Sequence, residues 1–160
     1  MTKIMTAQVV TINLKHSLRH AEELFAKHKI RHIPVVNGQE LIGMLSLTDL
    51  LRLSFMDNYG DDESSIDTAV YSMQVMVSNP VTVKSMQTIK EVAEILASRE
   101  FHALPVIDGT KLVGIVTTTD LIKYLLEQYD KIASRFKGFW RDGFASMFGN
   151  RKAPALAHFL

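Results

Sequence analysis

The sequence of 160 residues contains no cysteine. Disulfide bonds, thiolate nucleophiles and cysteine-ligated metal sites are therefore excluded. The sequence also has no apolar run long enough to cross a bilayer. Lys3, near the N-terminus, is not followed by a continuous apolar stretch, so we predict no secretory signal. These absences lead us to expect a cytoplasmic protein.

An excess of one charge is also lacking. The chain has 18 lysine and arginine residues against 17 aspartate and glutamate residues, for a formal net charge of +1. No global field therefore attracts nucleic acid or a membrane surface, and we expect neither as a partner. The sequence has no Gly-x-Ser-x-Gly elbow, no Walker-type phosphate loop and no dinucleotide fingerprint, so we do not expect an enzyme.

What the sequence does contain is an internal repeat. When it is shifted against itself by 71 residues, positions 5–50 align with positions 76–121 without a gap, and 13 of the 46 pairs are identical. Asp49, for example, aligns with Asp120. Most of the remaining pairs keep the chemistry of their side chains. We infer that the chain arose by duplication of one unit.

Each repeat begins with a short extended segment and a helix. The predicted extended segments are Val9–Ile12 and Val81–Val83. Ser17 and Thr88 stand at the positions of helix N-caps, and Thr88 with Glu91 forms a capping-box pattern. Apolar residues follow at spacings of three and four, which is typical of one buried helix face.

Two short β-rich runs and a second helix complete each repeat. The runs are Ile33–Val36 with Leu41–Leu45, and Leu104–Ile107 with Leu112–Val116. Between the runs, Asn37-Gly38 and Asp108-Gly109 each open a predicted four-residue hairpin loop. Thr48-Asp49 and Thr119-Asp120 predict the start of the second helix.

These patterns predict an α+β fold of two β-α-β-β-α units. One unit of this size cannot bury both helices and both faces of a three-stranded sheet, so we expect the two units to pack sheet to sheet about a pseudo-twofold axis. The last strand of each unit is apolar on both sides and should be buried from both faces. We place the first repeat at 1–56, an acidic linker with a helix near Ile66–Met73 at 57–74, the second repeat at 75–128 and a basic, aromatic tail at 129–160.

One polar motif occurs in both repeats, where the last strand runs into the second helix. It has the form Gly-apolar-apolar-(Ser/Thr)-x-Thr-Asp, at Gly43–Asp49 and at Gly114–Asp120. Free amides at a helix N-terminus and nearby hydroxyls favour a phosphate, and a carboxylate accepts hydrogen bonds from ribose hydroxyls. The alternative is that the Thr and Asp side chains merely cap the helix. Because the motif occurs twice in the same context, we favour a ligand site.

The order of the elements, the two motifs and two similar hairpins resemble a tandem pair of CBS (cystathionine-β-synthase-type) domains, a Bateman module of the stand-alone bacterial type. The hairpins are Ile33-Pro34-Val35-Val36-x-Gly38 and Leu104-Pro105-Val106-Ile107-x-Gly109. The resemblance covers about residues 1–127. It implies two clefts between the sheets that bind adenosine-containing ligands, namely AMP, ADP or ATP, or else S-adenosylmethionine. A magnesium ion could arrive with ATP.

The resemblance also implies ligand-binding residues, position by position. One site takes Thr11, Ile33, Pro34, Ser46, Thr48 and Asp49, and the other takes Thr82, Leu104, Pro105, Thr117, Thr119 and Asp120. In each site the aspartate would hold the ribose, and the hydroxyls would address phosphate or ribose. Arg31 and His102, each three residues before the hairpin proline, would meet phosphates, with His32 adjacent to Arg31. Arg31 would hold a phosphate by a forked contact at any pH, whereas His102 would do so better at lower pH.

A regulatory nucleotide sensor is the function that this resemblance implies. Such a module would act through an unidentified partner protein or through its own homodimer, and the helices would supply the dimer surface. Residues expected there are Leu50, Leu51, Leu53, Phe55, Leu121, Leu125 and Leu126. The alternative is a structural dimerisation module whose clefts are vestigial.

Two weaker signals remain. The histidine pairs His16/His20 and His28/His32 each straddle a predicted helix boundary, so we expect no dedicated metal site. In the tail, six basic residues stand against Asp142 alone, for a charge of 6 − 1 = +5 from Lys131 onward. Aromatic side chains are interleaved with them. We favour packing of these aromatics on the module or on a dimer neighbour, with docking on a partner protein or on an anionic membrane as alternatives.

Overall fold

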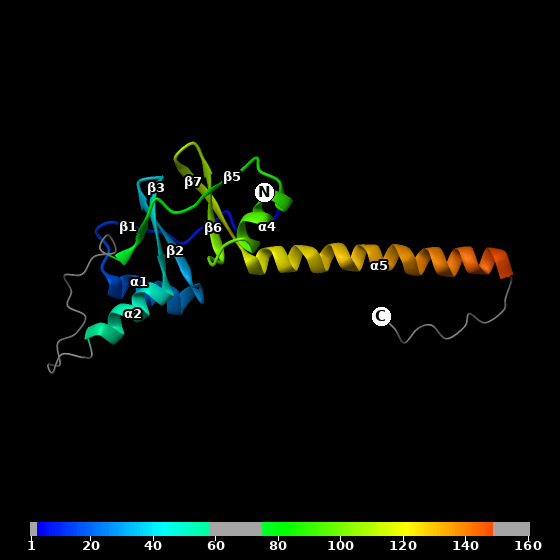
Figure 1. Cartoon of the computed structure of the whole chain (residues 1–160), viewed down its shortest axis with the longest axis horizontal. Helices are drawn as coiled ribbons and strands as arrows, with labels where there is room; N and C mark the ends of the chain where they lie inside the picture. The colour runs from blue at the N-terminus through cyan, green and yellow to red at the C-terminus, as the bar shows by residue number, and fades with distance from the viewer. Residues whose placement is uncertain (1–2, 58–74, 149–160) are drawn as a thin grey trace. The chain divides into compact units, whose positions relative to one another are not determined.

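The computed structural model describes residues 3–57 and 75–148. The first half contains β1 (Ile12–Asn13), α1 (Leu18–His28), β2 (His32–Asn37), β3 (Glu40–Ser46) and α2 (Leu47–Asp57). The second half contains β4 (Val77–Ser78), β5 (Val83–Lys84), α4 (Ile89–Ala97), β6 (Ala103–Asp108), β7 (Lys111–Thr117) and α5 (Thr118–Phe148) (Figure 1). The predicted α+β fold of two β-α-β-β-α units is confirmed. The helix predicted near Ile66–Met73 lies outside the described residues.

The two halves repeat each other in register. In the first half, β1 pairs in parallel with β2, and β2 pairs antiparallel with β3. In the second half, β5, β6 and β7 pair in the same way. Ile12 pairs with Val35, and 71 residues later Val83 pairs with Val106. The hairpins even share an irregularity, between Val35 and Val36 in one and at the equivalent step in the other.

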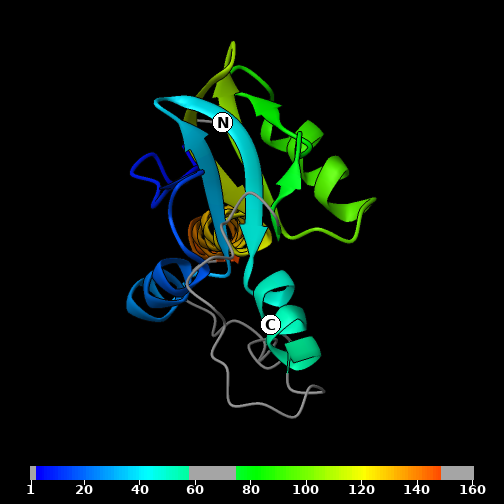
Figure 2. The ribbon, with the colours of Figure 1, turned by 90° about the vertical axis from the view of Figure 1, so that its left-hand side faces the viewer.

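The halves meet at the tips of their hairpins. Glu40 of β3 pairs with Lys111 of β7, its own equivalent in the repeat. Two backbone hydrogen bonds flank this pair, from the Leu41 N–H to the Thr110 carbonyl at 3.1 Å and from the Leu112 N–H to the Gln39 carbonyl at 2.9 Å. A shift of 71 residues exchanges these two bonds. The pseudo-twofold axis therefore passes through this junction, which makes the described strands one seven-stranded sheet (Figure 2).

Each half also lends a short segment to the other. Thr6 exchanges two backbone hydrogen bonds with Ile115 of β7, at 2.9 and 3.0 Å, and β4 pairs with Gly43 and Met44 of β3. The glycine of each motif is needed for this exchange. A Cβ on Gly114 would lie 2.8 Å from the sulfur of Met5, and a Cβ on Gly43 would overlap the side chain of Met76. We had interpreted these glycines as space for a ligand, and this interpretation is wrong because the exchanged segments fill the space.

The hydrophobic cores are duplicated as well. In the first half, α1 and α2 lie side by side against the β2–β3 hairpin (Figures 1 and 2). Its core consists of Ile12, Leu18, Ala21, Phe25, Ile33, Val35, Leu45 and Leu50. The second core consists of Val83, Val92, Leu96, Leu104, Val106, Val116 and Leu121. No residue of Leu41–Leu45 or Leu112–Val116 is exposed, as their apolar composition predicted.

The helix caps follow the sequence closely. The Ser17 hydroxyl accepts the backbone N–H of His20 at 3.3 Å. The predicted capping box of Thr88 and Glu91 is present in both directions. These hydrogen bonds to Thr88 lower the pKa of the Glu91 carboxyl, because they favour its charged form.

Two local predictions need correction. The segments 9–11 and 81–82 are not strands; each leading strand begins at the last residue of the predicted segment and continues one residue beyond it. The hairpin loops have two residues rather than four, because Asn37 pairs with Glu40 and Asp108 with Lys111. In both loops the first residue is a glycine with φ of +62°, a conformation that glycine adopts without a steric penalty.

The chain divides into two compact units after Leu121, so α5 from Ile122 onward is described by itself. Phe136, one of the tail aromatics, is 61% exposed. Packing on the module, our favoured interpretation, is therefore wrong for this residue, and the later tail aromatics lie beyond the described side chains. In the described part of the chain, no helix combines the length and the hydropathy that a membrane span requires.

Candidate functional site

The polar motif of each repeat forms a tight set of hydrogen bonds at the start of a helix. At the start of α5, the Thr117 hydroxyl donates to Asp120 Oδ2 at 2.7 Å and accepts the backbone N–H of Asp120 at 3.3 Å. The backbone N–H of Thr117 also donates to Asp120 Oδ2, at 2.8 Å. At the start of α2, Ser46 and Asp49 form an equivalent pair, with the Asp49 N–H donating to the Ser46 hydroxyl at 3.1 Å.

This geometry is a reciprocal helix cap, the alternative that we had weighed against a ligand site. It does not use the whole carboxylate. All three hydrogen bonds at Asp120 involve its Oδ2 atom, its N–H or Thr117, and Oδ1 has no hydrogen-bond partner among the described residues. A carboxylate held in this way is fixed in direction and still has acceptor capacity. Capping and ligand binding are therefore compatible at Asp120.

Asp120 lines a cleft of about 720 Å³, within the range of small-molecule sites. The lining residues are Thr6, Gln8, Val9, Val10, Lys29, Ile30, Arg31, His32, His102, Ile115, Thr117, Thr118, Thr119 and Asp120. All of them belong to the first compact unit. The cleft combines the leading segment and the loop before β2 from the first repeat with the motif of the second repeat. Our expectation of one site per repeat therefore differs from this arrangement.

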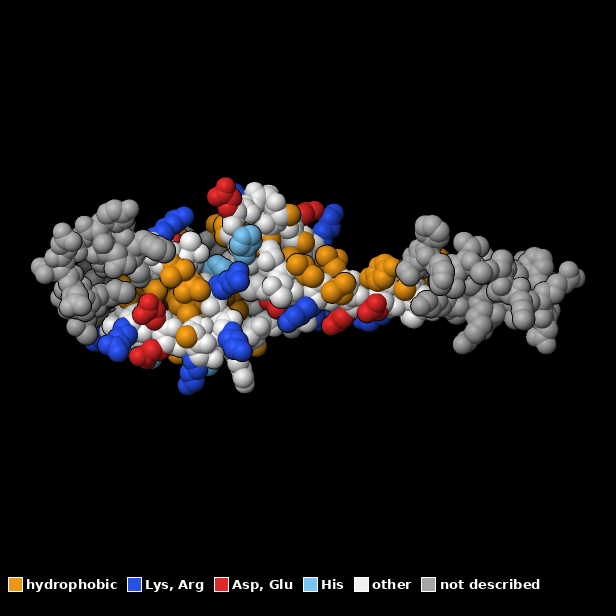
Figure 3. All heavy atoms as spheres, turned by 90° about the horizontal axis from the view of Figure 1, so that it is seen from below, with side chains coloured by type: hydrophobic (Ala, Val, Ile, Leu, Met, Phe, Trp, Pro, Cys, Tyr) orange, Lys and Arg blue, Asp and Glu red, His pale blue; other side chains and the backbone are white. Residues whose placement is uncertain are grey.

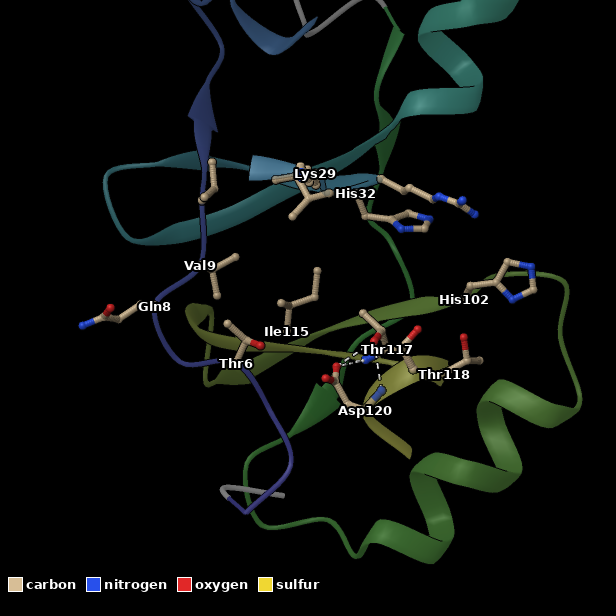
Figure 4. A pocket seen from close by; sticks show the side chains of 14 residues that line it. Thr6, Gln8, Val9, Lys29, His32, His102, Ile115, Thr117, Thr118 and Asp120 are labelled. Atoms are coloured by element: carbon tan, nitrogen blue, oxygen red, sulfur yellow. Dashed lines mark hydrogen bonds between the residues drawn. The ribbon is translucent and has the colours of Figure 1, made fainter. Parts of the chain in front are cut away.

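The two ends of the cleft differ in chemistry. Val9 and Ile115 lie toward one end, and His32 and His102 lie toward the other, on opposite hairpins (Figure 4). Thr117 and Asp120 lie between these ends, on the side of the β6–β7 hairpin (Figure 4). The cleft thus has an apolar region, a carboxylate with hydroxyls, and a basic region.

The basic region is built by the loop that follows α1. Lys29 is the C-cap of α1 and has a left-handed conformation, with φ of 53°. Arg31 is anchored to the next helix, because its carbonyl accepts the Leu47 N–H at 2.9 Å. His102 is anchored in the same way to Thr118, at 3.0 Å. Both anchored side chains are exposed, so their charged or polar ends are available to a ligand.

His32 is the titratable group of this region with a clear shift. Burial lowers its pKa below the ordinary value of 6.5, because it disfavours the charged imidazolium. His102 and Arg31 lower it further, while Asp49 acts in the opposite direction. His32 is therefore neutral near pH 7 when the cleft holds no anion.

The predicted residues fall into three groups. Six line the cleft, namely Arg31, His32, His102, Thr117, Thr119 and Asp120. Four have side chains that are buried inside the fold, so only their backbone atoms could meet a ligand; these are Ile33, Pro34, Leu104 and Pro105. The other five do not line this cleft: Thr11 and Thr82 precede β1 and β5, and Ser46, Thr48 and Asp49 belong to the start of α2.

Sequence reasoning missed several residues of the cleft. Lys29 lies two positions before Arg31, and its charge was a usable signal. Thr118 lies inside the motif, at the variable position. Thr6 and Gln8 gave no signal, because they reach the cleft only through the exchange of segments between the halves.

The histidines at the start of α1 come together, contrary to our expectation. The ring centroids of His16 and His20 are 4.6 Å apart, in an edge-on arrangement. Burial and the neighbouring His20 lower the pKa of His16. Within residues 3–57 and 75–148, no group of three or more His, Asp or Glu side chains gathers as metal ligands would.

Comparison with known proteins places this architecture in a family. The profile of the CBS domain matches residues 1–55 and 72–127. The CBS domain-containing protein YhcV of Bacillus subtilis (strain 168) is 30% identical over 118 residues, which cover 73% of this chain and 79% of YhcV. A solved structure from Vibrio cholerae, described as an acetoin utilization protein (AcuB), has a TM-score of 0.70 at 26% identity and covers 82% of this chain and 93% of its own.

A further solved structure contains a ligand. CBSX2, crystallised in complex with AMP, has a TM-score of 0.68 at 25% identity, over 79% of this chain and 96% of its own. The chain spans less than half the length of several other curated relatives that it matches, from 32% to 45%. The profile matches both repeats, and the repeats fold as one symmetric pair. The chain therefore belongs to the CBS domain family, as a tandem CBS domain pair similar to AcuB, CBSX2 and YhcV.

Proposed function

We propose that this CBS pair is a regulatory module that binds one adenine nucleotide in the cleft at Asp120. The observation that carries the proposal is the opposition of two kinds of wall across one cleft. A fixed carboxylate with hydroxyls lies on one side, and Lys29 and Arg31 supply permanent positive charge on the other. Apolar side chains at one end complete a set that suits a purine, a ribose and a phosphate.

Each part of the nucleotide has a matching group. The purine would lie against Val9 and Ile115, which are apolar. Asp120 Oδ1 would accept hydrogen bonds from the ribose hydroxyls. Arg31 would hold a phosphate by two parallel hydrogen bonds, and Lys29 would add a point charge. Thr119, exposed in the first turn of α5, would add a hydroxyl near the helix N-terminus, where a phosphate is favoured.

The charge of the cleft favours a nucleotide over S-adenosylmethionine. AMP, ADP and ATP are anions, whereas S-adenosylmethionine carries a sulfonium cation next to its adenosine. Lys29 and Arg31 attract the former and repel the latter. The relative CBSX2 was solved with AMP, which supports the same ligand class. A magnesium ion would enter only with ATP, as its counterion.

Regulation rather than chemistry is the proposed outcome of binding. The ligand would span residues from both repeats and so favour one arrangement of them, and a partner protein or a second copy of the chain would respond. Such an effect requires that the ligand bind the two arrangements with different affinity.

Calorimetric titration of the full chain with AMP, ADP, ATP and S-adenosylmethionine tests this proposal. We expect binding of the nucleotides and weaker or no binding of S-adenosylmethionine. Asp120→Asn should weaken nucleotide binding about 10- to 100-fold, the range for a hydrogen bond to a charged group. Asp49→Asn is the matched control, because Asp49 caps α2 as Asp120 caps α5. Equal losses in both variants, or hydrolysis of a titrated nucleotide, would contradict the proposal.

A structural dimerisation module is the second candidate. The observation in its favour is that Asp120 and Gly114 have complete structural roles without a ligand, in the helix cap and in the contact with Met5. A chain of this kind would bind none of the four ligands at millimolar concentration. Its melting temperature would accordingly be the same with and without them.

A further inference from the structure

Helix α5 carries an exposed hydrophobic stripe that starts just after the candidate site. Six large apolar side chains are each more than half exposed: Ile122 at 58%, Leu125 at 62%, Leu126 at 59%, Tyr129 at 56%, Ile132 at 54% and Phe136 at 61%. Hydrophobic side chains show on the surface of this helix in the space-filling view (Figure 3). A contiguous apolar stripe of this kind marks an interaction surface.

The spacing of the stripe identifies the type of partner. Ile122, Leu125, Tyr129, Ile132 and Phe136 are separated by three, four, three and four residues. These are the a and d positions of a heptad repeat, the pattern by which one helix packs along another in a coiled coil. Leu126 and Ala133 flank the stripe at the e position and widen it.

We propose that the stripe of α5 pairs with the same stripe of a second copy of the chain, in an antiparallel two-helix coiled coil. The charges along the helix favour this orientation. Positions 122–130 carry one lysine and two acidic residues, for a charge of 1 − 2 = −1, and positions 131–136 carry Lys131 and Arg135, for +2. An antiparallel pair places the acidic part of one helix beside the basic part of the other, whereas a parallel pair stacks like charges.

The pairing of side chains follows from the heptad positions. In an antiparallel coiled coil an a residue of one helix lies opposite a d residue of the other. Leu125 then lies opposite Phe136 of the second copy, and Tyr129 opposite Ile132. This interface differs from the one that the family resemblance implied, because Leu50 and Leu121, expected at the dimer surface, are 2% and 8% exposed and belong to the cores. The interface does not depend on nucleotide binding.

Sedimentation equilibrium of the full chain tests the self-association. We expect a dimer at micromolar concentration, and Ile132→Glu should weaken the dimer at least 100-fold. Ser134→Glu is the matched control, since it adds the same charge at an exposed position outside the stripe and should leave the dimer intact. Circular dichroism of both variants must match that of the unchanged chain, so that a folding defect is not counted as lost association.

Three outcomes would overturn the proposal. The first is a monomer at all concentrations, and the second is a dimer that Ile132→Glu does not weaken. The third is a monomer that binds vesicles of phosphatidylcholine and phosphatidylserine through Ile132, which would assign the stripe to a membrane surface.

The absence of cysteine makes the orientation testable by cross-linking. Leu125→Cys alone should form little disulfide dimer under oxidising conditions, because the two introduced thiols lie apart in an antiparallel pair. An equal mixture of Leu125→Cys and Phe136→Cys chains should cross-link efficiently. Strong cross-linking of Leu125→Cys with itself would contradict the antiparallel arrangement and support a parallel one.

Discussion

The two repeats build the same scaffold but surround it with different side chains. The strand registers, the hairpin irregularity and the two reciprocal helix caps all recur at a shift of 71 residues. The cleft at Asp120 is lined by Lys29, His32 and Thr118, and the same shift leads from these to Glu100, Ala103 and Leu47. A cation, an imidazole and a hydroxyl are thus replaced by an anion and two apolar groups. The equivalent positions around Asp49 are therefore poorly suited to a phosphate.

Backbone structure diverges at the same place. Helix α1 has 11 residues and ends at a left-handed Lys29, whereas α4 has nine and ends at Ser98 in a right-handed conformation. The loop before β6 is therefore longer than the loop before β2. Duplicated strands and helix starts have kept one geometry, while the loops that supply charge have changed. The comparison indicates one nucleotide site per chain, at Asp120.

The largest effect that we expect separates the two glycines of the motif. A Cβ on Gly114 would lie 3.1 Å from the backbone oxygen of Thr6, which cannot easily move, besides the Met5 sulfur. A Cβ on Gly43 would meet only the flexible side chain of Met76. Gly114→Ala should therefore lower the free energy of unfolding by about 1–3 kcal/mol, the usual cost of overpacking, and Gly43→Ala by less. Urea denaturation measures both values.

A double variant sharpens this test. If Met76 causes the cost of Gly43→Ala, then Met76→Ala should destabilise the Gly43→Ala chain less than it destabilises the unchanged chain. Equal losses for the two glycine variants would show that the exchanged segments do not distinguish the repeats.

The second effect concerns Arg31 and His102, which the 71-residue shift exchanges and which both line the Asp120 cleft. Arg31 is charged at any pH in the working range, whereas a histidine carries only a part of its charge near pH 7. Arg31→Ala should weaken AMP binding about 10-fold, and His102→Ala should weaken it about 2-fold or less. Titration calorimetry at pH 7.5 measures both. A larger loss for His102→Ala would reverse the assignment of the phosphate contact.

Much of the fold could be predicted from the sequence because its signals are local. The N-caps at Ser17 and Thr88, the apolar helix faces and the hairpin glycines each specify a few neighbouring residues. The element order then follows from the repeat. The loop length was mispredicted because a two-residue and a four-residue loop need the same Asn-Gly or Asp-Gly pair, and only the strand register decides between them.

The site was less predictable, because its walls come from distant parts of the chain. The motif around Asp120 was visible, and so was Arg31 through the family resemblance. Thr6 enters the cleft through its bridge to Ile115, a pairing between residues more than 100 positions apart that no local pattern encodes. The buried positions of Pro34 and Pro105 were likewise set by packing of the hairpins and not by any sequence signal.

The third effect tests the strained backbone at Lys29. A left-handed conformation suits glycine, which is the usual residue after a helix, and costs other residues about 1 kcal/mol. Lys29→Gly should therefore raise the free energy of unfolding by about 0.5–1 kcal/mol and weaken ATP binding several-fold, because a cation leaves the cleft. Asn79→Gly is the control: Asn79 is also left-handed, with φ of 51°, and does not line this cleft. A Lys29→Gly chain that is stabilised and binds ATP as before would exclude Lys29 from the phosphate contact.

The smallest effect is a pH dependence that the Asp49 side should lack, because Ala103 stands there in place of His32. Burial holds the pKa of His32 below 6.5, so the imidazole is neutral at pH 7 in the free protein. A bound phosphate raises that pKa, and binding therefore takes up protons and strengthens about 2- to 3-fold as the pH falls from 8 to 6.5. The titratable and charged groups that also face His32 are His102, Asp49, Arg31 and Lys29, so His102→Asn serves as the control for His32→Asn.

The same shift fixes the sign of the effect on stability. A histidine whose pKa is lowered by folding stabilises the fold above its unfolded pKa, and this contribution is lost as the pH falls through the folded pKa. His32→Asn should therefore lessen the loss of stability between about pH 6.5 and more acidic values, while it also removes the proton uptake on AMP binding. Titrations in two buffers of different ionisation enthalpy measure the uptake. Uptake that persists in His32→Asn and disappears in His102→Asn would place the proton on the opposite hairpin.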